Sequence, residues 1–186
     1  EWKSLARCVL QSPWGWKSNA AEMNEAHQAY LSLGSNIQPA YHLVRAIELL
    51  QTFGTLEKIS NAWESESVGA DGPNYLNACV LLRTLLHEDE LKRQALLPLE
   101  AELGRQRSAD RFAPRTMDID IVIFDNRSCD PKYWEQAFVV VPLAEIYPEF
   151  QHPLHTESLA ETAGRLRQQI WMERRPEVLS RFNRTA

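Results

Sequence analysis

The first clear pattern of apolar and polar positions begins near residue 29. Ala29–Leu33 is a short apolar run that ends at Gly34–Asn36, which predicts a buried strand leaving through a turn. Pro39 follows at a place where a first helical turn tolerates proline, and Gly54 ends the pattern. The apolar positions between them keep helical spacing: Leu43, Val44, Ile47, Leu50 and Phe53. The sequence therefore predicts a strand followed by an amphipathic helix.

Two further runs predict a pair of antiparallel strands. Leu56–Ser67 is rich in Ser, Ile, Trp and Val, and Leu76–Thr84 is mostly apolar. Val68–Asn74 contains glycine and proline, so we expect a loop there. The two strands are expected to pair across this long connection.

A second amphipathic helix is predicted from about His87 to Leu103, where Gly104 closes it. Its apolar positions are spaced by four: Leu91, Ala95, Leu99 and Leu103. Pro98 removes an amide donor and crowds Gln94, so we expect a kink.

The remaining elements complete an α+β fold. Asp118–Phe124 is predicted to be a strand, Phe138–Val141 a further strand, and Glu157–Glu173 a helix that starts with a capping box of Ser158 and Glu161. The order β-α-β-β-α-β is the split unit of the ferredoxin-like sandwich, in which two helices cover one face of an antiparallel sheet. The Phe138–Val141 strand and the last helix are C-terminal additions to it.

The chain divides into an N-terminal extension and one domain. Residues 1–28 have no clean period and an unknown role, with short helices expected at Lys3–Gln11 and Ala20–Ala26. Residues 29–186 form the predicted domain. Because the chain opens on Glu1 and not on Met, we expect a processed or excised product.

Composition excludes several classes of protein. The 186 residues are 44% hydrophobic and 24% charged, as in a globular domain. No apolar run approaches the ~20 residues of a membrane span, and no signal peptide is visible, so we expect a cytoplasmic protein without membrane contact. The net charge of −5 argues against a nucleic-acid partner. Three distant cysteines suggest neither a disulfide framework nor a zinc site.

Candidate chemistry begins with a cluster of arginines in this acidic chain: Arg105, Arg107, Arg111 and Arg115. Guanidinium groups so close together repel one another unless an anion binds among them, and a polyphosphate would suit. A solvated arginine-rich loop with scattered surface ion pairs is the alternative.

Two aspartates follow the arginines on the predicted strand. Because side chains alternate along a strand, Asp118 and Asp120 point to one face, while Ile119 and Ile121 point into the core. Paired carboxylates repel unless cations lie between them, and Mg²⁺ takes one or two carboxylates together with phosphate oxygens. An edge strand with outward acids is the alternative. Taken together, arginines and aspartates suggest phosphoryl transfer, although no Walker A or G-x-G-x-x-G motif is present.

Four stretches resemble 6-hydroxymethyl-7,8-dihydropterin pyrophosphokinases, which act in the folate pathway. They are Tyr30–Asn36, Trp63–Gly69, Pro73–Ala78 and Arg111–Val122, the last reading R-F-A-P-R-T-M-D-I-D-I-V. The similarity covers about Ala29 to Phe150. It implies a ferredoxin-like fold and transfer of the β,γ-pyrophosphate of ATP to the pterin hydroxymethyl group, with two Mg²⁺ ions and release of AMP.

The resemblance also implies roles for individual residues. Asp118 and Asp120 would hold both metal ions, with Arg105 and Arg115 as catalytic arginines. The nucleotide would be met by Arg107, Arg111, Ile121, Lys132 and Tyr133. The pterin would be met by Tyr75, Asn77, Phe138, the backbone of Ser65–Val68 and an aromatic lid at Phe112. Without the resemblance, core or turn positions are the preferred explanation of Tyr75, Asn77 and Phe138.

Some positions depart from the family pattern. Gln136 stands where an arginine is usual, Lys132 where a histidine is usual, and Leu97 where a helix glutamine often helps to bind the nucleotide. A lost charge-assisted hydrogen bond is worth about 1.5–3 kcal/mol, which would weaken the enzyme. A divergent paralogue that binds a pterin or nucleotide without efficient turnover is therefore the alternative. An RNA-binding ferredoxin-like domain is a third hypothesis, against which the net charge argues. The resemblance further implies fusion to, or action beside, other folate-pathway enzymes.

Overall fold

The computed structural model describes residues 26–67, 72–106 and 113–182. The predicted helix at Lys3–Gln11 lies outside these residues, as does the one at Ala20–Ala26 except for Ala26, which is not helical. The division of the chain at residue 28 stays a prediction.

The strands of the described residues form one antiparallel sheet with the order β6-β5-β1-β4-β3-β7, and β2 also pairs with β4. Their bounds are β1 His27–Ser35, β2 Thr55–Ile59, β3 Ala62–Ser65, β4 Tyr75–Thr84, β5 Asp118–Phe124, β6 Arg127–Ser128 and β7 Met172–Arg175. β1 lies between β4 and β5, as the split β-α-β unit requires. The predicted α+β, ferredoxin-like class is confirmed.

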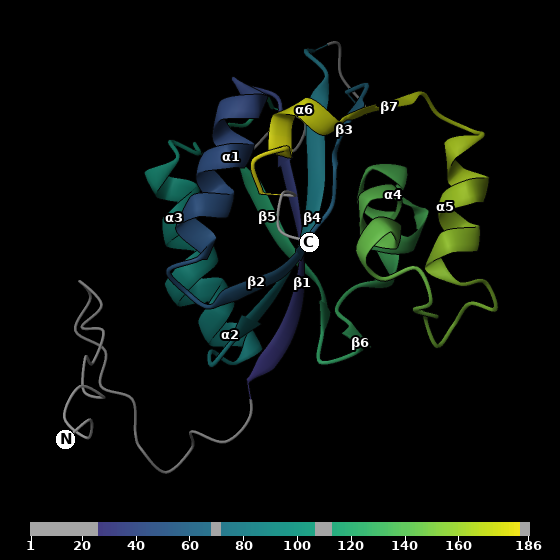
Figure 1. Cartoon of the computed structure of the whole chain (residues 1–186), viewed down its shortest axis with the longest axis horizontal. Coiled ribbons are helices and arrows are strands. Elements are labelled where there is room, and N and C mark those ends of the chain that lie inside the picture. The colour runs from purple at the N-terminus through teal and green to yellow at the C-terminus, as the bar shows by residue number, and fades with distance from the viewer. Residues whose placement is uncertain (1–25, 68–71, 107–112, 183–186) are drawn as a thin grey trace, which may run out of the picture.

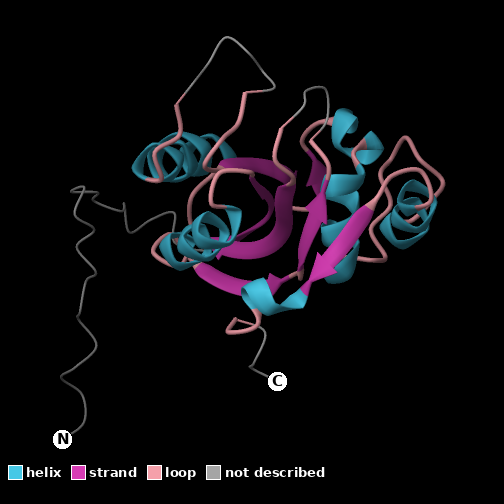
Figure 2. Ribbon diagram, turned by 90° about the horizontal axis from the view of Figure 1, so that it is seen from above, coloured by secondary structure: helices cyan, strands magenta, loops and turns pink. Residues whose placement is uncertain are grey.

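Helices cover both faces of this sheet. They are α1 Pro39–Leu50, α2 Glu88–Glu90, the π-helical η1 Leu91–Leu96, α3 Leu97–Glu102, the 3₁₀-helical η2 Pro131–Glu135, α4 Ala137–Ile146, α5 Leu159–Arg167 and α6 Pro176–Leu179. In Figure 1, α1 and α3 lie on one face, and α4 and α5 on the other, and Figure 2 shows helices on both sides of the sheet. The structure is therefore layered helix, sheet, helix.

The alternation of side chains along each strand feeds two hydrophobic clusters. On β1, Leu31 and Leu33 pack with α1 and α3, whereas Tyr30 packs with α4 and α5. On β5, Ile119 and Ile121 join the α1 side, as the sequence predicts. The two polar residues of β5, Asp118 and Asp120, alternate with these isoleucines and consequently face the α4 side of the sheet.

The predicted strand at Phe138–Val141 is wrong, because these residues belong to helix α4. The helix lies between the sheet and α5, so it is apolar all round and its sequence shows no helical stripe. Three consecutive valines favour a strand locally, and Pro142 lies inside the helix. Burial between two layers outweighs both preferences.

The predicted single strand Leu56–Ser67 is two strands, β2 and β3, separated at Ser60 and Asn61. Hydrogen bonds with residues of α4 and β4 stabilise this interruption of the strand. The Asn61 amide donates to Glu145 Oε2 of α4 at 2.7 Å, and the Cys79 amide donates to Ser60 Oγ at 2.9 Å. Both strands pair antiparallel with β4, as predicted.

Two predicted helices differ in their limits. Between His87 and Leu103, a π-helical segment separates α2 from α3, and Pro98 lies in the first turn of α3. Gly104 follows with a φ of 81°, which suits its expected role in ending the helix. The last helix is shorter than predicted: α5 ends at Arg167, and β7 occupies the rest.

The α5 capping box is confirmed. The Ser158 amide donates to Glu161 Oε2 at 2.8 Å, and the Glu161 amide donates to Ser158 Oγ at 3.3 Å.

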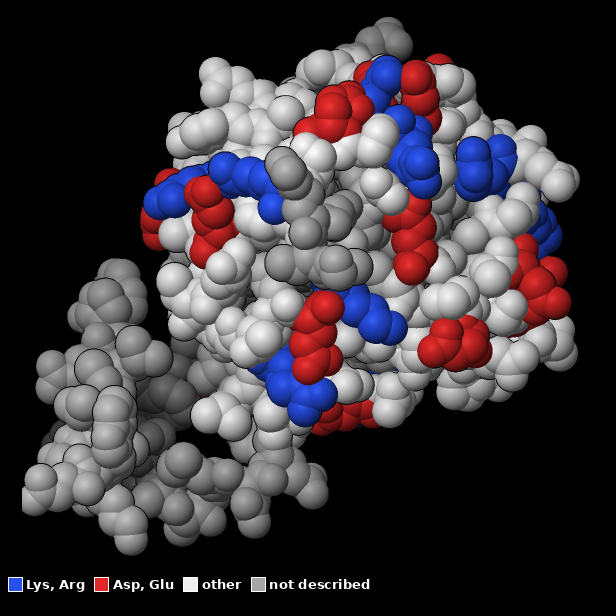
Figure 3. Space-filling model, in the orientation of Figure 1, with Lys and Arg blue, Asp and Glu red and all other residues white. Residues whose placement is uncertain are grey.

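The described surface mixes both signs of charge. Figure 3 shows lysine and arginine interspersed with aspartate and glutamate on the face turned to the viewer. None of the helices in the described ranges is both long and apolar enough to cross a membrane. Cys79 and Cys129 are free thiols.

Candidate active site

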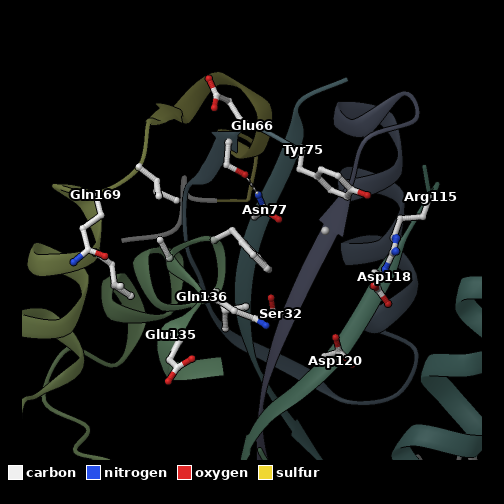
Figure 4. A pocket seen from close by; sticks show the side chains of 17 residues that line it. Ser32, Glu66, Tyr75, Asn77, Arg115, Asp118, Asp120, Glu135, Gln136 and Gln169 are labelled. Carbon is white, nitrogen blue, oxygen red and sulfur yellow. Dashed lines mark hydrogen bonds and ion pairs between the residues drawn. The ribbon is translucent and has the colours of Figure 1, made fainter. Parts of the chain in front are cut away.

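A cavity of about 440 Å³ opens on the α4 face of the sheet. β1, β3, β4 and β5 form its floor, and α4, α5 and the segment after α5 form its wall (Figure 4). Seven of the residues predicted from the sequence line it: Ser65, Tyr75, Asn77, Arg115, Asp118, Asp120 and Phe138. The fold therefore brings together side chains that are up to 73 positions apart in the chain, from Ser65 to Phe138.

Strand register sets the spacing of the floor. Gly34 of β1 pairs with Asn77 of β4 on one side and with Asp118 of β5 on the other. The amide and the carboxylate are thus two strand spacings apart, roughly 9.5 Å between Cα atoms. Gly34 has no side chain to rise between them, and a Cβ there would lie 3.2 Å from Asn77 Oδ1. A flat ligand can therefore lie across the glycine.

Asn77 is held in one orientation. Its Nδ2 donates to Ser65 Oγ at 3.0 Å, and both residues are buried. This contact uses one end of the amide and leaves Oδ1 as an acceptor over the floor of the cavity. The pair can read a donor on the edge of a heterocycle.

Asp118 binds two guanidinium groups. Arg105 donates to Oδ1, and Arg115 donates to Oδ2 at 2.5 Å. Burial alone would raise the pKa of Asp118, but the hydrogen bonds and charges of the two arginines outweigh it and lower the pKa. Asp118 is therefore an ionised carboxylate that fixes two cations at the pocket.

Asp120 has a different environment. Burial raises its pKa, the negative charge of Asp118 adds to this effect, and Lys132 and a hydrogen bond with Tyr133 oppose it. None of the guanidinium groups in the described ranges forms an ion pair with Asp120. It is a half-buried carboxylate beside a second negative charge, which a bound cation would stabilise.

Glu100 is a part of the site that the sequence analysis missed. It is 3% exposed, and its Oε1 accepts from Arg105 Nη1 at 2.7 Å and from the Ile119 amide at 2.8 Å. Burial raises its pKa to about 7, although the Ile119 amide and Arg105 act in the opposite direction. The only sign of it in the sequence is an acidic residue directly after Leu99, beside the apolar positions of the helix.

The segment that carries Arg115 is anchored to the turn after β1. The Arg115 amide donates to Asn36 Oδ1 at 2.8 Å, and its carbonyl accepts from the amides of Asn36 and Ile37 at 3.1 and 3.3 Å. The Gly-Ser-Asn turn predicted from the sequence therefore positions a pocket residue.

Most of the other residues singled out in the sequence, Arg105 among them, lie outside the cavity or outside the described ranges, and Gln136 is the exception. Lys132 is exposed and pairs with Asp130 at 2.7 Å, and Tyr133 is buried and hydrogen-bonds Asp120. Ile121 faces the α1 side and is 9% exposed. Leu97 begins α3, and Gln136 lines the cavity next to α4. Four lie outside the described residues: Val68, Arg107, Arg111 and Phe112. The roles assigned to all these residues stay predictions.

Comparison with known proteins decides the family. A sequence model described as 7,8-dihydro-6-hydroxymethylpterin-pyrophosphokinase (HPPK) matches residues 30–148. The chain belongs to this family. A Synechocystis relative named 2-amino-4-hydroxy-6-hydroxymethyldihydropteridine pyrophosphokinase is 36% identical over 140 residues, which cover 69% of this chain and 71% of the relative.

Other relatives are longer proteins. Folic acid synthesis protein fol1 of Pneumocystis carinii is 33% identical over 155 residues, covering 77% of this chain but 20% of that protein. A crystal structure of Plasmodium falciparum HPPK-DHPS superimposes with a TM-score of 0.61 at 12% identity. That match covers 80% of this chain and 46% of the Plasmodium chain, so this chain spans less than half of it. At this identity the likeness shows the fold alone.

The predicted family and its class of reaction, pyrophosphoryl transfer in folate biosynthesis, are thereby confirmed. None of these comparisons favours a binding protein without turnover.

Proposed function

We propose that this chain transfers the β,γ-pyrophosphoryl group of ATP to the hydroxymethyl oxygen of 6-hydroxymethyl-7,8-dihydropterin. The observation that carries the proposal is the row Asn77, Gly34 and Asp118 across three strands, which joins a heterocycle-reading amide to a charged cluster in one cavity. Membership of the HPPK family supports the same reaction.

The reaction is a displacement at phosphorus. The hydroxymethyl oxygen forms a bond to the β-phosphorus, and the bond from that phosphorus to the α,β-bridging oxygen breaks. AMP leaves with the bridging oxygen, and the hydroxyl proton is released. The protein contributes by positioning both substrates and stabilising the phosphate charge.

In the pterin half of the cavity, Asn77 would hydrogen-bond the ring edge beside the backbone of Ser65. Phe138 and Tyr75 both line the cavity and would contact the flat ring. Val68 and Phe112 are proposed to complete this half.

In the phosphate half, Arg105 and Arg115 would exchange Asp118 for phosphate oxygens. Arg115 lines the cavity, and Arg105, which does not line it, is held next to it by the Asp118 carboxylate, whose charge resembles that of a phosphate. Further nucleotide contacts are proposed for Arg107, Arg111, Ile121, Lys132 and Tyr133.

The carboxylates of Asp118 and Asp120 suit Mg²⁺. Both lie on one face of β5 and line the cavity, and the second lacks an arginine partner among the described residues. Magnesium prefers such oxygen ligands and keeps other positions for phosphate and water. Two Mg²⁺ ions bound there would neutralise phosphate charge and polarise the β-phosphorus. Release of Arg105 and Arg115 from Asp118 would free its oxygens for this purpose.

The proposal is tested by AMP formation from ATP, the pterin and Mg²⁺. The wild-type chain should form AMP only when all three are present. Asp120→Ala should remove activity while circular dichroism shows an intact fold. Asp125→Ala is the control, because Asp125 follows the last residue of β5, at the end opposite to Asp118, and contacts His27. Full activity of Asp120→Ala would refute the site.

We further propose a cytoplasmic enzyme without nucleic-acid or membrane partners, fused to or acting beside other folate-pathway enzymes. The length of the Pneumocystis relative, of which this chain covers 20%, supports the fusion.

A further inference from the structure

One wall of the pocket comes from the C-terminal part of the chain. Leu166 of α5 and the residues Gln169 and Ile170 that follow it line the cavity. They lie beyond residue 148, where the family match ends. These three residues are called the C-terminal wall below.

The C-terminal wall lies at the end of the cavity away from the aspartates. In Figure 4, Asn77 lies between Gln169 and Asp118. The strand order agrees, since β7, which begins two residues after Ile170, forms one edge of the sheet, and β5 lies next to the other edge. A ligand with its reacting group at Asp118 therefore points its far end at the wall.

The wall is fixed to the pocket floor. Met172 of β7 pairs with Ser65 of β3, which lines the cavity. Ile170 lies two residues before Met172 and is therefore held close to β3. Arg175 Nη2 of β7 forms an ion pair with Glu64 Oε2 at 2.6 Å. The Arg167 guanidinium lies 4.7 Å from the ring centre of Trp63 on β3. These contacts hold the wall at a set distance from Asn77.

Ile170 is unusual because it is apolar, lines the cavity and is still 41% exposed. Leu166 behind it is 6% exposed and belongs to the core. An apolar side chain at a pocket rim loses its contact with water when an apolar surface covers it. The flat ring of the ligand supplies such a surface.

We infer that the C-terminal wall contacts the pyrimidine edge of the pterin, the edge farthest from the hydroxymethyl group, and limits the size of heterocycle accepted. Ile170 and Leu166 contact the pterin ring with their methyl groups. The Gln169 side-chain amide can both donate a hydrogen bond to, and accept one from, the amino and amide groups on the pyrimidine edge of the pterin. This inference rests on the proposed function.

The test compares neighbouring substitutions. Ile170→Ala removes a cavity residue, and Trp171→Ala is the matched control, since Trp171 is 46% exposed and does not line the cavity. Binding of 6-hydroxymethyl-7,8-dihydropterin is followed by its fluorescence with a non-hydrolysable ATP analogue and Mg²⁺ present, and KM is measured for each substrate.

Ile170→Ala should raise the Kd and KM of the pterin about three- to tenfold and leave the KM of ATP within about twofold. Gln169→Ala should do the same. Ile170→Ala should also improve the use of a pterin methylated on its 2-amino nitrogen relative to the parent pterin.

Two results overturn the inference. One is that Ile170→Ala and Gln169→Ala bind the pterin as the wild-type chain does. The other is that Trp171→Ala weakens binding as much as Ile170→Ala. If the wild-type chain neither binds the pterin nor forms AMP, the proposed function itself fails, and the inference fails with it.

Discussion

Replacing Asp118 and Asp120 separately by asparagine is expected to change stability in opposite directions. Asp118→Asn removes the charge between Arg105 and Arg115, both of which are about one fifth exposed. Asparagine can accept from one guanidinium only, and its amide group repels the other. Loss of a part-buried, charge-assisted pair should lower the free energy of unfolding by about 2–4 kcal/mol.

Asp120→Asn removes a repulsion instead. Carboxylates at i and i+2 of a strand are roughly 6.6 Å apart, which at an effective dielectric constant of ~20 corresponds to about 2.5 kcal/mol of repulsion. The charges of Lys132 and Lys92 offset part of this, so the net gain should be about 1 kcal/mol. The asparagine Oδ1 can still accept from Tyr133.

Thermal and urea unfolding without Mg²⁺ measure both effects. At roughly 2–4 °C per kcal/mol for a chain of this size, Asp120→Asn should raise Tm by about 3 °C, and Asp118→Asn should lower it by about 4–16 °C. Both variants should lose AMP formation. If both changes lower Tm by similar amounts, the electrostatic account of the two carboxylates is wrong.

Two further substitutions test the floor and the wall of the site. Gly34→Ala places a methyl group about 3.2 Å from Asn77 Oδ1 and should raise the pterin KM about tenfold, with the KM of ATP unchanged; an equal rise in both would contradict the assigned position of the ring. Hydrogen bonds from Asn74 and Arg175 lower the pKa of Glu64 below its ordinary value of 4.5. The ionised Glu64 side chain therefore stabilises the folded chain at pH values above 4.5, and this contribution is lost as the pH falls through the lower pKa of the folded state. Glu64→Gln should therefore be less stable than the wild-type chain by up to about 1 kcal/mol at pH 7 and nearly equal to it at pH 3 in urea titrations; a difference independent of pH would exclude this mechanism.

Local sequence patterns were sufficient to predict the part of the site that lies on β5. Alternation along a strand placed Asp118 and Asp120 on one face and Ile119 on the other, and the structure has this arrangement. The turn after β1 was equally visible, because glycine and asparagine have specific backbone and hydrogen-bonding roles. These features depend on a few consecutive residues.

Features held by distant contacts were not predictable. The break between β2 and β3 depends on Glu145, which is 84 residues from Asn61. The Phe138–Val141 run is helical because two layers bury it, and a short apolar run does not distinguish a buried strand from a buried helix. Ile170 belongs to the site only through the pairing of β7 with β3.

The row of Asn77, Gly34 and Asp118 acts as a ruler built from main-chain hydrogen bonds. Its length cannot be adjusted gradually, because a strand that slips by one residue turns every side chain to the opposite layer. Substitutions at Asn77 or Asp118 can change which ligand group is bound at each position, but the sheet fixes the distance between the two positions. A longer or shorter substrate would require the binding residues to come from other paired positions of the strands. A wider or narrower substrate would require only different side chains at the cavity entrance.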